Sequence, residues 1–315
     1  MTRAAKISLC AAAAVIALAM PAGTEGLAGY GGVKLCNACH KKTNGAIVEA
    51  QPKTPHASAL WAVADQSDLH KLVGDFASAP GFKQADVAYV LGQGVTRAQA
   101  YIGSDFKVLP AEWDVHGKKW VAIPADDAKK NCIACHTTGY DVASGGWKDA
   151  GVTCEACHGP GSNHAKSSPT DKKATIVNPK TLAPDRQAMI CGRCHSHGKN
   201  PDGLPFAAGY VPGEDLNKFV KLDATWDQGA RNSQYNDLVT GKHLTANVTC
   251  VTCHDPHGVT TQPHQLLKSP DETCAQCHPT DKLSGPQHSP AKDCVRCHMI
   301  NGSHQFEKPQ VVPAS

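Results

Sequence analysis

The chain has 315 residues, only 5% of them aromatic, and its 31 basic and 28 acidic side chains give a formal net charge of +3. So balanced a charge excludes the strongly basic surface with which nucleic-acid-binding proteins attract the phosphate backbone. Because large apolar side chains are few for a core of this length, we expect part of the apolar bulk to come from a cofactor.

Residues 1–28 are predicted to be a signal peptide. Arg3 and Lys6 precede an apolar, Ala-rich run over 7–20, which is too short to span a bilayer. Cys10 does not fit a lipoprotein signal, because a bulky Leu precedes it and the apolar run continues after it. No later stretch is apolar enough to span a membrane, so we expect an exported protein in the periplasm or at the cell exterior.

A five-residue pattern, C-x-x-C-H, occurs seven times. Its paired cysteines are Cys36 and Cys39, Cys132 and Cys135, Cys154 and Cys157, Cys191 and Cys194, Cys250 and Cys253, Cys274 and Cys277, and Cys294 and Cys297. The histidines that follow are His40, His136, His158, His195, His254, His278 and His298.

This pattern is typical of covalent haem attachment, in which both thiols form thioethers and the adjacent histidine ligates the iron. A zinc site or a disulfide framework gives no reason for a histidine after every second cysteine. The sequence therefore predicts seven covalently bound haem c groups, whose propionates would make the mature protein acidic.

A haem-free insert is expected over 61–130, between the first two motifs. Residues 61–77 are predicted to be helical. Short strands are expected at Val87–Leu91, Ala98–Ile102, Trp113–Val115 and Lys119–Ile123, the last two joined by a turn at His116 and Gly117. The predicted fold is mainly α, with much irregular loop and a small β-hairpin region, organised around stacked haems.

The segments GYGGVKLCNACH, CIACHTTGY, GVTCEACHGPGSNH and ICGRCHSHG resemble the tetrahaem cytochrome c-554 family. The segment that begins YVLG also looks like multihaem cytochromes of metal-reducing bacteria, some of which form extracellular haem filaments. The resemblance implies haems stacked in pairs, mostly with two histidine ligands, and a role in carrying electrons. It predicts a tetrahaem domain over 29–215 and leaves a trihaem module over 216–315.

Bis-histidine ligation is the economical expectation, because the chain has 17 histidines and only 4 methionines. His164 follows the GPGSNH turn and matches the distal ligand of the c-554 family. Loops near the motifs supply the other expected distal ligands, His56, His243, His257, His288 and His304. For the seventh we chose His197, with His70, His116, His264 or a histidine of a neighbouring subunit as the alternatives.

Two functions from different classes follow from these motifs. The first is electron transfer along closely packed haems, to or from quinol-linked proteins, other cytochromes or an extracellular acceptor, with assembly into a filament as a variant. The second is an oxidoreductase that converts a small nitrogen or sulfur compound at one haem without a distal histidine. We predict no catalytic side chain, no transmembrane segment and no nucleic-acid partner.

Overall fold

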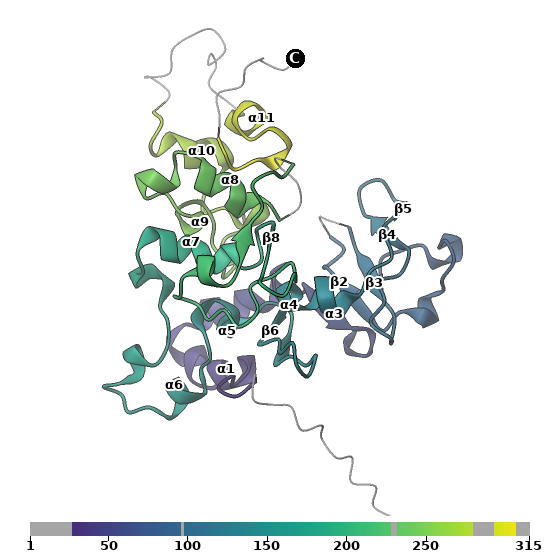
Figure 1. Cartoon of the computed structure of the whole chain (residues 1–315), viewed down its shortest axis with the longest axis horizontal. Coiled ribbons are helices and arrows are strands. Elements are labelled where there is room, and N and C mark those ends of the chain that lie inside the picture. Colours follow the sequence, from purple (N-terminus) through teal and green to yellow (C-terminus); the bar gives the residue numbers. More distant parts are fainter. Residues whose placement is uncertain (1–26, 96–97, 228–231, 280–292, 307–315) are drawn as a thin grey trace, which may run out of the picture.

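The computed structural model describes residues 27–95, 98–227, 232–279 and 293–306 (Figure 1). Two regions stand out in it. A helical column runs from α1 and α6 at one end to α10 and α11 at the other, and a lobe of strands lies to one side of it. Almost all of the predicted signal peptide, and the predicted ligand His288, lie outside the described residues.

The helices are short. They are α1 (Val33–Thr43), α2 (Gly45–Ala50), α3 (Ala128–Asn131), α4 (Ile133–His136), α5 (Cys154–His158), α6 (Ser162–Lys166), α7 (Pro184–Gly192), α8 (Gln234–Thr240), α9 (Cys250–Cys253), α10 (Pro270–Ala275) and α11 (Cys294–His298). The helices α1, α5 and α11 contain a whole C-x-x-C-H motif, and α4, α7, α9 and α10 contain part of one. Residues three and four apart share one face of a helix, which brings the cysteines and the histidine of a motif together. None of the described helices is long and apolar enough to cross a membrane. We call α1, α2 and α5–α11 the helical column.

The strands β1 to β5 form the side lobe, which we call the sheet lobe. They are β1 (Leu60–Ala62), β2 (Tyr89–Leu91), β3 (Ala100–Ile102), β4 (Ala111–Asp114) and β5 (Lys119–Ala122). The first three make an antiparallel sheet in the order β1-β2-β3, in which Trp61 pairs with Val90 and Val90 with Tyr101. The predicted strands in 86–123 are thus confirmed, with ends that differ by one or a few residues.

The predicted helix over 61–77 is wrong. Residues 60–62 form β1, and only the short 3-10 turns at Val63–Asp65 and Phe76–Ser78 follow it. Leu60 and Trp61 are both fully buried, but in different apolar clusters on opposite faces of the sheet. A run of adjacent apolar residues suits a strand buried on both faces, and burial here outweighs the weak helical preference of the segment.

The hairpin β4–β5 is confirmed, with Asp114 opposite Lys119 and the turn at His116 and Gly117. Asp114 Oδ1 accepts the backbone N–H groups of His116 and Gly117, each over 3.0 Å. This local bonding explains the turn, and it places His116 at an exposed loop tip of the sheet lobe.

An apolar cluster in the column crosses the expected boundary between residues 215 and 216. It joins Ala188 and Met189 of α7 to Leu216, Tyr235 and Leu238. The small strand pairs β6 (Thr137–Thr138) with β7 (Asp149–Ala150), and β8 (Gly198–Lys199) with β9 (Lys221–Leu222), add further links, the second across the same boundary. The two expected parts of the column therefore share one core.

Candidate haem sites

Several of the motif histidines share one local arrangement. Their Nδ1 atoms meet oxygen acceptors: Asn44 Oδ1 at His40 (3.1 Å), Ala59 O at His136 (2.9 Å), Val177 O at His158 (2.8 Å), Gln234 Oε1 at His195 (3.1 Å) and His264 O at His254 (2.9 Å). An acceptor at Nδ1 fixes the N–H there and leaves the lone pair on Nε2, the arrangement usual for a histidine that binds a metal.

A second imidazole lies opposite five of the seven motif histidines, four of those just named and His278. The ring centroids are 6.2 Å apart for His40 and His164, 6.1 Å for His195 and His56, 6.2 Å for His158 and His257, 6.3 Å for His254 and His304, and 6.2 Å for His278 and His243. If each Nε2 bonds the same metal ion over about 2 Å, the two centroids lie about 6 Å apart. The gaps are thus the right size for one iron between two imidazoles.

The opposing histidines come from other parts of the chain than the motifs they face. His56 lies between the first two motifs and faces the fourth, and His257 follows the fifth motif and faces the third. Five of the expected distal ligands therefore each face a motif histidine in the structure: His56, His164, His243, His257 and His304.

Burial lowers the pKa of His56 to about 4, with smaller effects from His195 and His254 nearby. His56 is thus a neutral imidazole, as ligation of a metal requires.

His136 differs from the five motif histidines with an opposing imidazole. It is half-buried, and desolvation lowers its pKa, but among the described residues no second imidazole lies across from its ring. His197, our choice for the seventh distal ligand, is held in a loop where its backbone N–H donates to Asn236 Oδ1 over 2.8 Å. His70 stacks on Trp61 in the sheet lobe, with ring centroids 5.3 Å apart. Among the described residues, the second motif therefore has no imidazole pair like those at the five motifs above.

Thiols of different motifs interact in four pairs. The thiols of Cys36 and Cys154, Cys135 and Cys194, Cys191 and Cys250, and Cys274 and Cys294 lie close enough to shift each other's pKa. Weaker electrostatic contacts join Cys157 to Cys194 and Cys253 to Cys274. The motifs thus follow one another in space in the order first, third, fourth, fifth, sixth and seventh, and the second motif branches off at the fourth.

The thiols shift one another's pKa before any thioether forms. The neighbouring Cys135 thiol, aided by the Arg193 guanidinium, lowers the pKa of Cys194 to about 7.

The described residues hold no group of three or more histidine, cysteine or acidic side chains placed to bind one metal ion. The cysteines and histidines present fit covalent haem with axial imidazoles.

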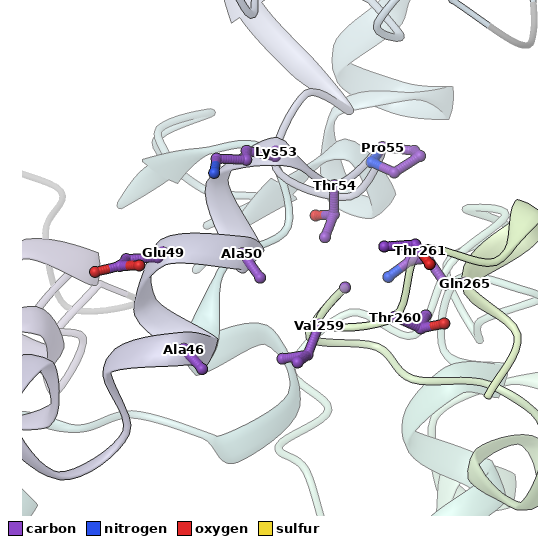
Figure 2. A pocket seen from close by; sticks show the side chains of 11 residues that line it. Ala46, Glu49, Ala50, Lys53, Thr54, Pro55, Val259, Thr260, Thr261 and Gln265 are labelled. Atoms are coloured by element: carbon purple, nitrogen blue, oxygen red, sulfur yellow. The ribbon is translucent and has the colours of Figure 1, made fainter.

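A groove of about 460 Å³ lies between two loops that each carry an opposing histidine (Figure 2). Lys53, Thr54 and Pro55 precede His56 on one side, and Val259 and Thr260 follow His257 on the other. The loops touch beside it, since a Cβ added to Gly258 would lie 2.4 Å from Thr54 Cγ2. The groove thus marks where the N-terminal and C-terminal parts of the column meet.

Comparisons with known proteins agree with these motifs. Residues 106–159 match the family model described as cytochrome c554 and c-prime, and residues 243–283 match the doubled CXXCH motif. The chain is a multihaem c-type cytochrome. The resemblance to the c-554 family that the sequence indicated is confirmed for this cytochrome.

Two curated relatives match part of the cytochrome. The multiheme cytochrome MtrA of Shewanella baltica is 31% identical over 161 residues, which are 46% of this chain and 47% of the relative. Cytochrome c-554 of Nitrosomonas europaea is 33% identical over 106 residues, 28% of this chain and 44% of the relative. The cytochrome thus spans less than half the length of these relatives.

Two solved structures share the fold of the cytochrome. The outer cell wall cytochrome OcwA has a TM-score of 0.72 at 23% identity, with 89% of this chain and 80% of that one covered. The undecaheme cytochrome from the S-layer of Carboxydothermus ferrireducens has a TM-score of 0.55 at 23% identity and covers 89% of this chain and 52% of that one. The arrangement of helices and sheet lobe is therefore a multihaem cytochrome fold.

Sequence reasoning missed the groups that hold the ligands in place. Gln234 and Asn44 accept from motif histidines, and Asn236 holds the loop at His197. Asn44 lies four residues after His40, so helical spacing could have indicated it. Gln234 and Asn236 lie far along the chain from their partners, and no local pattern marks them.

Proposed function

We propose that this cytochrome binds seven haems and carries electrons from one end of its helical column to the other. A bound haem iron alternates between its ferric and ferrous states and so accepts and passes on one electron. The observation that carries the proposal is the unbroken sequence of neighbouring motifs from the first to the seventh, whose thiols interact at each step.

The paired imidazoles favour electron transfer over conversion of a substrate. Paired imidazoles at five motifs would occupy both axial positions, which leaves no site for a substrate there. Histidine on both sides also gives lower potentials than the Met/His pair of other cytochromes c, because a thioether ligand raises the potential. The proposed partners are redox proteins or an extracellular acceptor, outside the cytoplasmic membrane.

The first test is an absorption and EPR study of the oxidised, purified holoprotein, repeated with carbon monoxide on the reduced form. We expect low-spin signals from the five haems with paired imidazoles, and carbon monoxide binding at the haem of the second motif. The holoprotein should be reduced by a low-potential dye and reoxidised by ferric citrate. High-spin signals from several haems would contradict the proposal.

Electron microscopy at rising protein concentration tests assembly into filaments, and isolated particles at all concentrations would exclude it.

The second candidate function is conversion of a small nitrogen or sulfur compound at the second motif. It is favoured by the single imidazole of His136 and by its place on a branch beside the fourth motif. Steady-state turnover with nitrite, hydroxylamine or tetrathionate tests it, and no turnover with any of them would count against it.

A further inference from the structure

Glu155 is a buried acidic residue inside the third motif, between Cys154 and Cys157. Its side chain is 1% exposed. Haem attachment needs only the two cysteines and the histidine of a motif, so it does not explain this glutamate. Acidic side chains are almost never fully buried unless their charge is compensated.

Three backbone N–H groups compensate the charge of Glu155. Its Oε1 accepts from Gly31 N–H over 2.8 Å and from Gly161 N–H over 2.6 Å, and its Oε2 accepts from Gly32 N–H over 2.7 Å. All three partners are donors, which suits an ionised carboxylate because that group only accepts. Hydrogen bonds to an ionised acceptor are among the strong ones in proteins.

The backbone that Glu155 holds leads to both imidazoles of the first haem site. Gly31 and Gly32 directly precede α1, which carries His40, and Gly161 directly precedes α6, which carries His164. The two rings lie parallel within 14°, with centroids 6.2 Å apart. One carboxylate of the third motif thus fixes the start of both helices that face each other across the first site.

We infer that Glu155 is a positioning residue for the first haem, and that it keeps His164 within bonding distance of that iron. The inference rests on the proposed function, since it takes His40 and His164 as ligands of one iron. A residue of the third motif would thus position a ligand of the first haem. Support of the third haem alone, or of the fold in general, is the competing explanation.

The test compares Glu155→Gln with the parent holoprotein. Glutamine keeps the size of the side chain, but its amide NH2 group would meet the backbone N–H of Gly32 in one orientation, or those of Gly31 and Gly161 in the other. In either case two donors face each other, and the start of at least one helix is held less firmly. We expect one additional high-spin haem per chain by EPR and one additional carbon monoxide bound after reduction. Haem content by mass spectrometry should be unchanged.

Two further variants locate the affected haem. His164→Ala should give the same spectral change as Glu155→Gln, and the double variant should bind no more carbon monoxide than His164→Ala alone. Glu214→Gln is the matched control, because Glu214 also accepts a backbone N–H, from Val211 over 2.9 Å, in an exposed turn. Its spectra should equal those of the parent protein.

The outcomes separate the inference from the proposed function. If His164→Ala adds no high-spin haem to those of the parent protein, the ligand assignment fails. Two results would refute only the role of Glu155. In the first, His164→Ala makes one more haem high-spin and Glu155→Gln makes none; in the second, the double variant makes two more haems high-spin. Should the glutamine variant not accumulate, Glu155→Asp, charged but one methylene shorter, is expected to expose the same haem. Failure of both to accumulate would contradict the inference, because Glu155 would then support the whole fold.

Discussion

The sheet lobe and the helical column differ in what fills their interiors. In the lobe, Trp61, Phe82 and Tyr101 are buried and meet Phe76 and Trp120, and the rings of Phe82 and Trp120 lie 5.2 Å apart. In the column, the motif helices α1, α9, α10 and α11 bury no residue of their own. One region thus has an ordinary apolar core, and the other has motif helices whose apolar partners would be haems.

This contrast explains how a chain with so few aromatic residues can fold. The lobe gathers about half of them, and its second cluster reaches the second motif, where Ile133 of α4 packs with Leu60 and Ile102. A cofactor that supplies apolar surface makes folding depend on binding, as metal does in small metal-stabilised domains. The haem-free insert therefore supports the second motif from a core that needs no cofactor.

The largest expected effect follows from removing the haems. When the chain is produced without haem attachment, the column should lose its fold around α1, α9, α10 and α11, because these motif helices bury no residue of their own. The sheet lobe should keep its own. Hydrogen exchange followed by mass spectrometry is the measurement, with fast exchange expected over 250–279 and protection over 87–122. Equal protection in both regions would contradict the comparison.

Trp61→Ala should unfold the sheet lobe and leave the ligation of the haems unchanged. The side chain is 1% exposed, and truncation of a buried Trp costs about 3–5 kcal/mol of stability. We expect loss of protection over 87–122, with unchanged low-spin signals at the five sites with imidazole pairs. Val121→Ala is the control, since this residue of β5 is 37% exposed and its truncation should change stability by less than about 0.5 kcal/mol. A change in those low-spin signals would show that the two regions depend on one another.

His257→Ala should act on the column alone. It removes the imidazole opposite His158, so we expect one more high-spin haem per chain and one more carbon monoxide bound after reduction. The N-terminal and C-terminal parts should also separate more easily, seen as faster hydrogen exchange over 46–55. His116→Ala, in the exposed turn of the lobe, is the control and should leave the spectra unchanged. An unchanged spectrum in His257→Ala would refute the assignment of this ligand.

Asp237→Asn should have the smallest effect. The carboxylate is fully buried and accepts the backbone N–H of His304 over 2.9 Å and the Trp226 indole N–H over 2.7 Å. An asparagine can accept only one of them well, and an unsatisfied buried donor costs about 1–3 kcal/mol. Denaturation followed at the haem absorption band is the measurement. Asp202→Asn, at an exposed position, serves as the control, and an equal midpoint for both variants would contradict this role.

The haem sites were predictable only in part. Each C-x-x-C-H motif is local, so the sequence could locate the attachment cysteines and the motif histidines. The strands of the lobe were predictable from alternating apolar residues and turn signals. Residues 61–77 were mistaken for a helix because a strand buried on both faces lacks alternation, and whether it is buried depends on contacts with β2.

The sequence alone determined that the chain carries haem-attachment motifs, how many there are, and that it belongs with the multihaem cytochromes. Only the tertiary structure decided which histidine faces which of five motifs, and in what order the motifs adjoin. The physical reason is that attachment is completed within five consecutive residues. Axial pairing joins segments as distant as His56 and His195, and only the folded chain brings these together.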